Sequence, residues 1–512
     1  MGGRWLASAR RHAERPALVA ESNSYSYRSL AAAALGVAGA LRKRAEFAEG
    51  IRVALLAGNT PEYLAGFYGI LLAGGVAVPL PEQIERQMLD RVLADSGACL
   101  LLTAPGRRYP AIQSAMDSEE LDLAKSPAIQ PPVAAAGADP RHSAAMILYT
   151  SGSTGQPKGV LLSHGNLLSN AESILAYLPI GPHDRALAVL PFCHAFGNSV
   201  VQTHLLTGGT LVVDGSTTFP NSMVDALERH DVNSFAGVPE IYNGLLACSD
   251  LGRRPLPSLR YMTVAGAALH HDSACEMARR IKPAHFYVMY GQSEATARLA
   301  YLPSEQLHRR RSSIGLAIPG VELEVRDEQG RTMAVGATGE LCARGANVML
   351  GYWRNPQATN RVLKDGWLHT GDLAKRDADG FLYVSGRRQD EVKIRGLKVA
   401  PGAVAETLSR WLPNCRICVV PFEINHTVRL ALFVETNAPR PSLQHEIRQV
   451  CADALTQRER PSHIEIVDQL PLTPSLKIDR KALEKRATEG AASKWGSALT
   501  TKAEELSEVV AN

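Results

Sequence analysis

The feature that most constrains the fold is a repeated unit in which a helical pattern leads directly into a short apolar run. "ERQMLDRVLADSG" leads into "ACLLLT", "SMVDALERHD" into "VNSFAGVP", and "CEMARRI" into "HFYVMYG". Short runs that are apolar throughout are typical of parallel strands that helices cover on both faces. The repeat therefore predicts an α/β fold of the doubly wound class for the first two-thirds of the chain.

The pattern changes at about residue 318, where alternating strands and glycine-containing turns begin, as in "VELEVRDEQGRTM" and "KRDADGFLYVSGR". Such segments are typical of antiparallel hairpins. After residue 388, helices and strands mix again in a segment of ordinary domain size. We predict a large N-terminal domain (1–388) of helix-covered, mostly parallel sheets with a β subdomain (about 318–388), a small mobile α+β C-terminal domain (389–487) and a polar tail (488–512).

Composition and charge exclude several classes of protein. Of the 512 residues 45% are hydrophobic and 21% charged, and the net charge is only +4, so we expect a globular protein without a nucleic-acid partner. The longest apolar stretch (69–81) is too short to span a bilayer. Eight scattered cysteines favour a reducing, cytoplasmic setting. The pair Cys415 and Cys418 lacks the further ligands that a zinc site needs.

The segment "YTSGSTGQPKG" (149–159) has the composition of a phosphate-binding loop. A Walker loop ends in Gly-Lys-Ser/Thr, whereas here Lys158 stands between Pro157 and Gly159. Proline also has no N–H to donate to a phosphate. We therefore exclude a Walker-type NTPase, but the glycines, hydroxyls and single lysine suit a mobile site for a phosphate-sized anion.

This segment is the first of four motifs, which continue with "YGQSEAT" (290–296), "WLHTGDLAKRDADGFLYVSGRRQDEVKIRG" (367–396) and "PLTPSLKIDRKAL" (471–483). In this order and spacing they closely resemble the adenylate-forming enzymes, which include acyl-CoA synthetases, aryl-CoA ligases, luciferases and peptide-synthetase adenylation domains. The resemblance covers about residues 10–485. It implies an AMP-forming ligase in fatty acid metabolism or a related pathway: a carboxylate attacks the α-phosphorus of ATP, and a thiol then displaces AMP from the acyl adenylate.

The resemblance also implies how ATP is bound. The glycine-rich loop covers the β- and γ-phosphates, Glu294 provides the Mg²⁺ carboxylate, Tyr290 stacks on adenine, Asp372 accepts the ribose hydroxyls, and Arg387 contacts ribose or phosphate. The residues expected to bind ATP or AMP are Thr150, Ser151, Gly152, Ser153, Thr154, Gly155, Lys158, Gly266, Ala267, Ala268, Tyr290, Gly291, Gln292, Ser293, Asp372 and Arg387.

For the C-terminal domain, the resemblance implies that Lys477 is the catalytic lysine, which bridges the acyl carboxylate and the α-phosphate. Gly396 matches the loop that the incoming pantetheine approaches. Gln389 occupies the hinge about which the small domain rotates, where the family usually has Asp or Lys. Leu476 replaces a glycine and Ala403 replaces a glutamate of the family pattern. These departures concern the thioester-forming step more than adenylation.

The segment "LPFCHAFGNSV" (190–200) bears on the class of acid. Relatives that activate α-amino acids carry an aspartate here for the substrate's ammonium group, whereas this segment has His194 and no carboxylate. A buried ammonium without a counter-charge is costly, so an α-amino acid is disfavoured, and a β-amino, peptidyl or aryl acid stays open. The residues expected to line the acyl pocket favour a fatty acid of medium or longer chain. The implied acyl pocket comprises His194, also counted among the catalytic residues, with Phe196, Gly197, Gly237, Val238, Ile241, Gly291 and Gln292.

The acceptor and two rival functions also stay open. No carrier-attachment motif follows the lysine motif, so we expect the thiol to come from CoA or from a separate phosphopantetheinyl carrier protein. A luciferase-like oxidase would need O₂ after adenylation. A non-catalytic binding protein would be expected to have lost Lys477, Glu294 or Asp372, and all three are present.

Overall fold

The computed structural model describes residues 1–20, 23–44, 47–105, 117–120, 142–151, 157–215, 217–388, 392–394, 397–412, 415–424, 427–436, 443–457, 459–473 and 478–490. They divide into two compact units. Unit 1 comprises Met1–Glu324 and Cys342–Thr370, and unit 2 comprises Val325–Leu341 and the chain from Gly371 onward. The predicted domains 1–388 and 389–487 stay predictions.

The larger sheet of unit 1 has nine strands within the described residues. Its central strands are parallel neighbours, because β10 pairs with β1 and β9, and β11 pairs with β9 and β12, which in turn pairs with β13. Antiparallel strands β2, β14 and β15 complete the two edges. The order is β15 (Leu316–Ala317), β14 (Ala300–Leu302), β13 (His285–Tyr290), β12 (Tyr261–Val264), β11 (Ser234–Gly237), β9 (Arg185–Leu187), β10 (Thr210–Val213), β1 (Pro16–Ala20) and β2 (Asn23–Ser26).

The second sheet of unit 1 has seven strands within the described residues. It is parallel through β6, β5, β3, β4 and β7, and antiparallel where β7 meets β8 and β8 meets β18. The order is β18 (Gly351–Tyr352), β8 (Pro157–Ser163), β7 (Ala144–Ser151), β4 (Val76–Leu80), β3 (Arg52–Leu56), β5 (Leu100–Thr103) and β6 (Asp117–Glu120).

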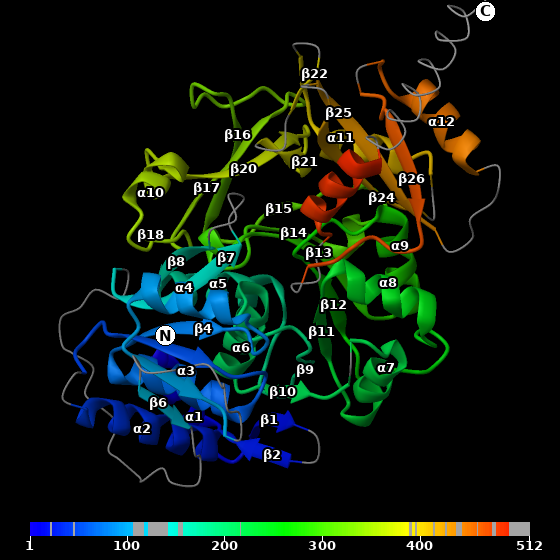
Figure 1. Ribbon diagram of the computed structural model, residues 1–512. Coiled ribbons are helices and arrows are strands. Elements are labelled where there is room, and N and C mark those ends of the chain that lie inside the picture. The colour runs from blue at the N-terminus through cyan, green and yellow to red at the C-terminus, as the bar shows by residue number, and fades with distance from the viewer. Residues whose placement is uncertain are drawn as a thin grey trace, which may run out of the picture. The chain divides into compact units, whose positions relative to one another are not determined.

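Helices cover these sheets, and Figure 1 shows α7, α8 and α9 along one side of β11–β13. Three helices precede the strands predicted from the repeat, α4 before β5, α7 before β11 and α9 before β13. The helices of unit 1 are α1 (Gly2–Arg11), α2 (Tyr27–Lys43), α3 (Pro61–Ala73), α4 (Arg86–Ser96), α5 (His164–Tyr177), α6 (Ala195–Thr207), α7 (Pro220–Arg229), α8 (Pro239–Cys248), α9 (His271–Arg280) and α10 (Pro356–Val362), with short 3₁₀ helices η2 (Ser293–Ala295) and η3 (Ser304–Gln306).

The start and end of a helix follow from local sequence signals, as α3 shows. Thr60 caps its first turn by accepting a hydrogen bond from the Tyr63 backbone N–H, and Pro61 occupies the first helical position. At the other end Gly74 adopts a left-handed conformation with φ of 92°, which glycine adopts without steric penalty. Among the described helices, none is long and apolar enough to cross a membrane.

Strands β16 (Val321–Arg326), β17 (Gly339–Gly345) and β20 (Trp367–Arg376) run along the chain from one unit into the other. In their sheet β16 pairs with β17, β17 with β20, and β20 with both β19 (Leu363–Lys364) and β21 (Leu382–Arg387). This region is antiparallel where β20 meets β19 and β21, as predicted for the β subdomain.

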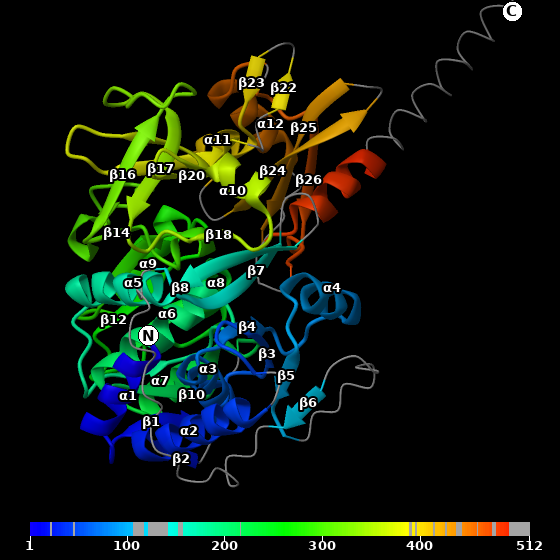
Figure 2. The same ribbon diagram turned by 90° about the vertical axis from the view of Figure 1, so that its left-hand side faces the viewer.

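The rest of unit 2 is the compact α+β arrangement expected from the sequence. β24 (Arg416–Ile424) pairs antiparallel with β25 (Thr427–Glu435), which pairs in parallel with β26 (His463–Val467). β22 (Val392–Ile394) and β23 (Leu397–Val399) form a separate hairpin, visible in Figure 2. Helices α11 (Pro401–Ser409) and α12 (Leu443–Ala454) precede β24 and β26, and residues 480–490 are helical. The predicted α/β fold class is confirmed.

Candidate active site

The predicted phosphate loop connects two paired strands. β7 and β8 are antiparallel, and their last described pairs are Thr150 with Lys158 and Ser151 with Pro157. Residues 152–156 lie outside the described part of the chain. Gly159 is required by packing, because a Cβ there would lie 2.7 Å from Cγ2 of Ile147. The paired strands therefore place Thr150 and Lys158 opposite each other, at the two ends of the loop.

Lys158 and Glu294, which come from different motifs, are brought together by Tyr352. The Lys158 Nζ lies 5.3 Å from the centre of the Tyr352 ring, a cation–π distance. The Tyr352 hydroxyl donates to Oε1 of Glu294 at 2.8 Å. Tyr352 belongs to β18, which pairs with β8 next to Lys158. Tyr352 thus contacts both the cation of Lys158 and the carboxylate of Glu294.

The half-buried carboxylate of Glu294 has no basic partner among the residues that the structure describes. Within the described residues, no Lys, Arg or His nitrogen lies within 4.0 Å of it, and Tyr352 is its hydrogen-bond donor. A carboxylate oxygen is the ligand that Mg²⁺ prefers, and a neutral donor leaves its negative charge in place. The donor set therefore fits a hard divalent cation.

The residues predicted to bind adenine lie at one edge of the large sheet. β11, β12 and β13 are adjacent and parallel, so their carboxyl ends meet at the same edge, where nucleotides bind in open α/β sheets. Exposed Gly266, Ala267 and Ala268 follow β12, and half-buried Tyr290 ends β13. Gln292 and Ser293, also predicted ligands, are half-buried directly after Tyr290.

Two of the predicted site glycines are explained by close backbone contacts. A Cβ at Gly291 would lie 1.9 Å from the Ala297 carbonyl oxygen, and one at Gly197 would lie 2.1 Å from the Pro191 carbonyl oxygen. Real Cβ atoms never approach backbone oxygens this closely, so any larger residue would displace the chain. These glycines fix the loops that carry Gln292 and His194.

The predicted acyl-pocket residues lie at the start of two helices and the end of one strand. His194 caps α6 and is half-buried, like Phe196 in the first turn. Gly237 ends β11, Val238 caps α8, and Ile241 is buried inside that helix. The neighbouring Cys193 is no nucleophile, because burial raises its pKa to about 12.

In unit 2, Asp372 and Arg387 form an ion pair. They stand opposite each other on β20 and β21, with Arg387 Nε 3.2 Å from Oδ1 of Asp372. Asp372 is buried while the Arg387 side chain is 53% exposed. The exposed side of Arg387 leaves this pair accessible to a polyhydroxyl or phosphate ligand.

Several predicted site residues lie outside the described part of the chain. For Ser151 the structure gives only the backbone, in β7. The others are Gly152, Ser153, Thr154, Gly155, Gln389, Gly396 and Lys477, together with Leu476. The roles of all of them stay predictions from the resemblance.

Sequence reasoning missed two residues of this region, Tyr352 and Arg298. Tyr352 stands in "GYWRN" (351–355), between two of the motifs, and carries no pattern of its own. Arg298 follows the "YGQSEAT" motif by two residues and is 3% exposed. Only the pairing of β18 with β8 and the burial of the loop after η2 show that these side chains belong here.

Comparison with known proteins places this geometry in a family. The AMP-binding enzyme family matches residues 5–353. A feruloyl-CoA synthase of an Amycolatopsis species is 32% identical over 446 residues, covering 85% of this chain and 89% of the relative. A long-chain-fatty-acid–CoA ligase of Yersinia pestis is 29% identical over 526 residues, covering 93% and 92%.

Among solved structures, the chain is similar to o-succinylbenzoate coenzyme A synthetase (MenE) from Bacillus subtilis in complex with ATP and magnesium ion. The TM-score is 0.81 at 27% identity, with 93% of this chain and 98% of the other covered. The predicted class, an AMP-forming acid–thiol ligase, is confirmed. The chain belongs to the AMP-binding enzyme family, as its four motifs predicted.

Proposed function

We propose that this protein activates a carboxylic acid with ATP and transfers the acyl group to the thiol of CoA, releasing AMP and pyrophosphate. The observation that carries the proposal is the cluster of Lys158, Tyr352 and Glu294 beside the β7–β8 hairpin. It unites two separate motifs into a site with a cation for phosphate and a carboxylate for a divalent metal, and this carboxylate has no basic partner in the described part of the chain.

The reaction has two displacements. A carboxylate oxygen of the acid attacks the α-phosphorus of ATP, and the bond from that phosphorus to the pyrophosphate oxygen breaks, which gives acyl-AMP and pyrophosphate. The thiol then loses its proton, its sulfur attacks the acyl carbon, and the carbon–oxygen bond to AMP breaks. No group of the protein becomes covalently attached, so catalysis is a matter of position and charge.

Each half of the nucleotide meets a different part of the protein. Tyr290 and the Gly266–Ala268 loop provide a surface for the base, and Thr150 and Lys158 flank the loop that covers the outer phosphates. By the resemblance, Asp372 would accept the ribose hydroxyls and Arg387 would contact ribose or phosphate. Lys477, from the resemblance, neutralises the charge that develops between carboxylate and α-phosphate.

ATP and Mg²⁺ are the cofactors, as in the MenE complex. The Mg²⁺ ion, when bound, neutralises the charge of the departing pyrophosphate. In this chain Glu294 would hold it, and the hydroxyl of Tyr352 orients that carboxylate from behind.

The second step is assigned by resemblance. Gln389 would form the hinge about which the small domain turns, and Gly396 would line the approach of the thiol. CoA is the acceptor that the relatives' names favour, and a phosphopantetheinyl carrier protein is the second candidate. The cytoplasmic location stays a prediction, in keeping with the eight free thiols.

For the acid, the sequence predicts a fatty acid of medium or longer chain, and one observation favours an aryl acid instead. Phe196 packs in a cluster with Tyr177, Tyr287 and Tyr301, and the rings of Tyr177 and Tyr301 stack with centres 4.0 Å apart. Aromatic walls suit a planar ring. The two curated relatives named above divide between these same two classes.

The test is acid-dependent exchange between ATP and labelled pyrophosphate across fatty, aryl, α-amino and β-amino acids, followed by AMP release on addition of CoA. We expect exchange with one class and stimulation of AMP release by CoA. Exchange that CoA does not pull forward assigns the thiol to a carrier protein. O₂ uptake would support a luciferase-like oxidase, and the absence of exchange with every acid would leave the non-catalytic binding protein.

Lys477→Ala provides the matched control for the first step. The variant should lose adenylation while a preformed acyl adenylate still reacts with the thiol. Equal loss of both steps would remove the role proposed for Lys477.

A further inference from the structure

A buried arginine in unit 1 is not used by the reaction as described so far. Arg298 is 3% exposed. Its guanidinium donates from Nη1 to the thioether sulfur of Met289 at 2.9 Å and from Nη2 to the hydroxyl of Ser199 at 3.3 Å. Its Nε–H has no acceptor. A thioether is a weak acceptor, so the cation has only neutral partners, and one of its donors is unsatisfied.

The missing partner is a negative charge. Across the described residues, no carboxylate oxygen lies within 4.0 Å of the Arg298 guanidinium. The buried carboxylate of Asp184 is instead paired with Arg260. An isolated buried charge is strongly unfavourable and is normally paired. The described part of the chain therefore keeps a cation in its interior without supplying the counter-charge.

Hydrogen bonds from neighbouring side chains hold the backbone of Arg298 in position. Its backbone carbonyl accepts hydrogen bonds from Nδ2 of Asn170 at 3.0 Å and from Nδ2 of Asn347 at 3.1 Å. Two residues earlier, Thr296 has a positive φ of 70°, which is unfavourable for a β-branched residue. Its hydroxyl donates to the Asn347 carbonyl at 2.7 Å. Strain held by such a network is typical of functional loops.

Arg298 lies against the predicted acyl pocket. Its guanidinium carbon is 4.5 Å from the centre of the Phe196 ring, and Phe196 is one of the pocket walls. Ser199, one turn further along α6, also borders a cavity of about 10 Å³ lined mainly by polar residues such as Asn198 and Gln202, enough for about one water molecule. Phe196 thus has a cationic group over its ring and a mainly polar cavity one turn further along α6.

We infer that the acid substrate carries an oxygen acceptor at the end opposite its reacting carboxylate, and that Arg298 binds this distal oxygen. The inference rests on the proposed function and deepens it. A second carboxylate or a phenolic oxygen supplies the same chemistry, an oxygen that accepts from the guanidinium and replaces the sulfur of Met289 or the hydroxyl of Ser199. A plain alkyl chain would leave the cation unpaired and is disfavoured.

The experiment compares acids that differ only at the distal end. The aromatic set is cinnamate, 4-hydroxycinnamate and 4-carboxycinnamate, and the aliphatic pair is hexanoate and adipate. The readout is kcat/KM for acid-dependent ATP–pyrophosphate exchange. In at least one set, the acid with the distal oxygen should exceed its unsubstituted partner about 10- to 100-fold. The phenol and carboxylate arms distinguish the two sources of the oxygen.

Two variants assign the preference to Arg298. Arg298→Met should remove it by lowering the rate for the oxygen-bearing acid more than the rate for the unsubstituted one. Ser199→Asp keeps the arginine but supplies an internal counter-charge, and should also abolish the preference. Arg298→Lys should retain part of it, because the charge stays while the planar fork is lost. Arg254→Met, at an arginine paired with carboxylates and not among the predicted pocket residues, serves as the matched control and should keep the wild-type profile.

The outcomes separate the two proposals. If the wild type exchanges with acids but shows no preference in either set, this inference is wrong and the proposed function stands. A preference that survives both Arg298→Met and Ser199→Asp also overturns it. If no acid supports exchange, the proposed function itself fails and this inference with it. The wild-type comparison decides the matter even where a variant does not fold.

Discussion

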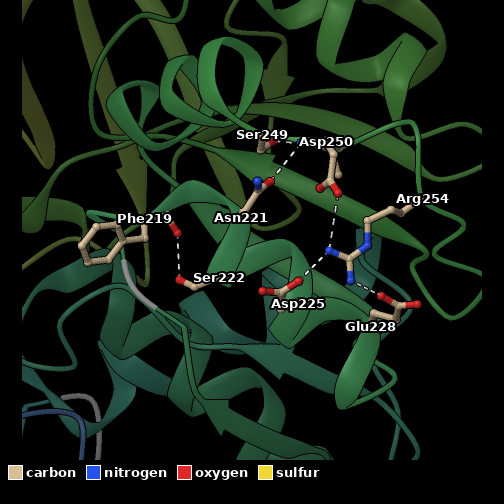
Figure 3. A network of polar contacts seen from close by, with 9 residues as sticks. Phe219, Asn221, Ser222, Asp225, Glu228, Ser249, Asp250 and Arg254 are labelled. Carbon is tan, nitrogen blue, oxygen red and sulfur yellow. Dashed lines mark hydrogen bonds and ion pairs between the residues drawn. The ribbon is translucent and has the colours of Figure 1, made fainter.

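Two arginines of unit 1 are treated in opposite ways. Arg254 is partly exposed and lies among three carboxylates, those of Asp225, Glu228 and Asp250, as Figure 3 shows. The hydrogen bonds that Arg254 donates to Asp225 and Glu228 raise its pKa further. Arg298 is buried and has no carboxylate partner among the described residues. The more exposed Arg254 is thus paired with carboxylates, whereas the buried Arg298 has no carboxylate partner among the described residues.

Glu294 repeats the second pattern with the opposite sign. It precedes Arg298 by four residues, yet the two side chains do not pair, because Glu294 contacts Tyr352 and Arg298 contacts Phe196 and Ser199. A structure selected only for stability would satisfy both charges with each other. Charges that the fold holds apart and leaves unpaired are available to a ligand, whereas a network such as that of Arg254 is complete in itself.

The largest effect is expected for Glu294→Gln, which tests the contrast between charges that are paired and charges that are available to a ligand. The change removes the negative charge but keeps the shape, so the site should lose its affinity for the metal that accompanies ATP. We expect kcat/KM for ATP to fall about 100- to 1000-fold, with a higher Mg²⁺ requirement in the exchange assay. Glu228→Gln, in the Arg254 network, is the control and should leave the assay unchanged. Equal effects of the two changes would break the comparison.

Tyr352→Phe tests the orientation of Glu294 rather than its charge. Loss of the hydroxyl removes the hydrogen bond at 2.8 Å and leaves the ring beside Lys158. Groups that orient a metal ligand typically contribute 10- to 100-fold to metal affinity, and we expect an effect near the lower end, about tenfold. The measurement is the Mg²⁺ dependence of exchange, and an unchanged dependence would show that Tyr352 only fills space.

A smaller effect concerns pH and the buried region around Arg298. Burial lowers the pKa of His204 below its ordinary value of 6.5, and the charge of Arg298 lowers it further. Below about pH 6.5 the unfolded chain therefore binds a proton at His204 that the folded protein does not bind. The free energy of unfolding is consequently at its full value above pH 6.5 and declines as the pH falls below it. One proton contributes at most about 1.4 kcal/mol per pH unit.

His204→Gln should accordingly flatten the decline in the free energy of unfolding below pH 6.5. Glutamine can still hydrogen bond to the Val200 carbonyl and the Ser234 hydroxyl, which the histidine contacts at 2.9 and 3.2 Å. The measurement is urea unfolding above and below pH 6.5. A slope identical to that of the wild type would mean that His204 is protonated in the folded protein.

The smallest effect is expected at Arg254. Pairs between exposed groups contribute little and are screened by salt, so Arg254→Ala should lower Tm only slightly, less so at high salt, and should leave exchange activity unaltered. A differential scan at low and high salt measures this. A large loss of activity would show that the network takes part in function and would remove the distinction drawn above.

Much of this architecture is predictable from local patterns. The helix-then-strand repeat predicted the parallel sheets, because residues that form a covered strand must be apolar on both faces, and α4–β5, α7–β11 and α9–β13 are confirmed as such units. Motif resemblance predicted Glu294 and Lys158, since their chemistry lies in the residue type and its immediate neighbours. In the structure both residues contact the same side chain, that of Tyr352.

What the sequence by itself determined is the class of the protein, through residue types at fixed spacing. What only the tertiary structure decided is which charges are satisfied. Tyr352 contacts Glu294 across 58 residues of chain and Arg298 contacts Ser199 across 99, and neither contact follows from local periodicity. Burial and pairing depend on how distant strands pack. An arginine is therefore a paired, partly exposed residue at position 254 and a buried cation without a carboxylate partner among the described residues at position 298.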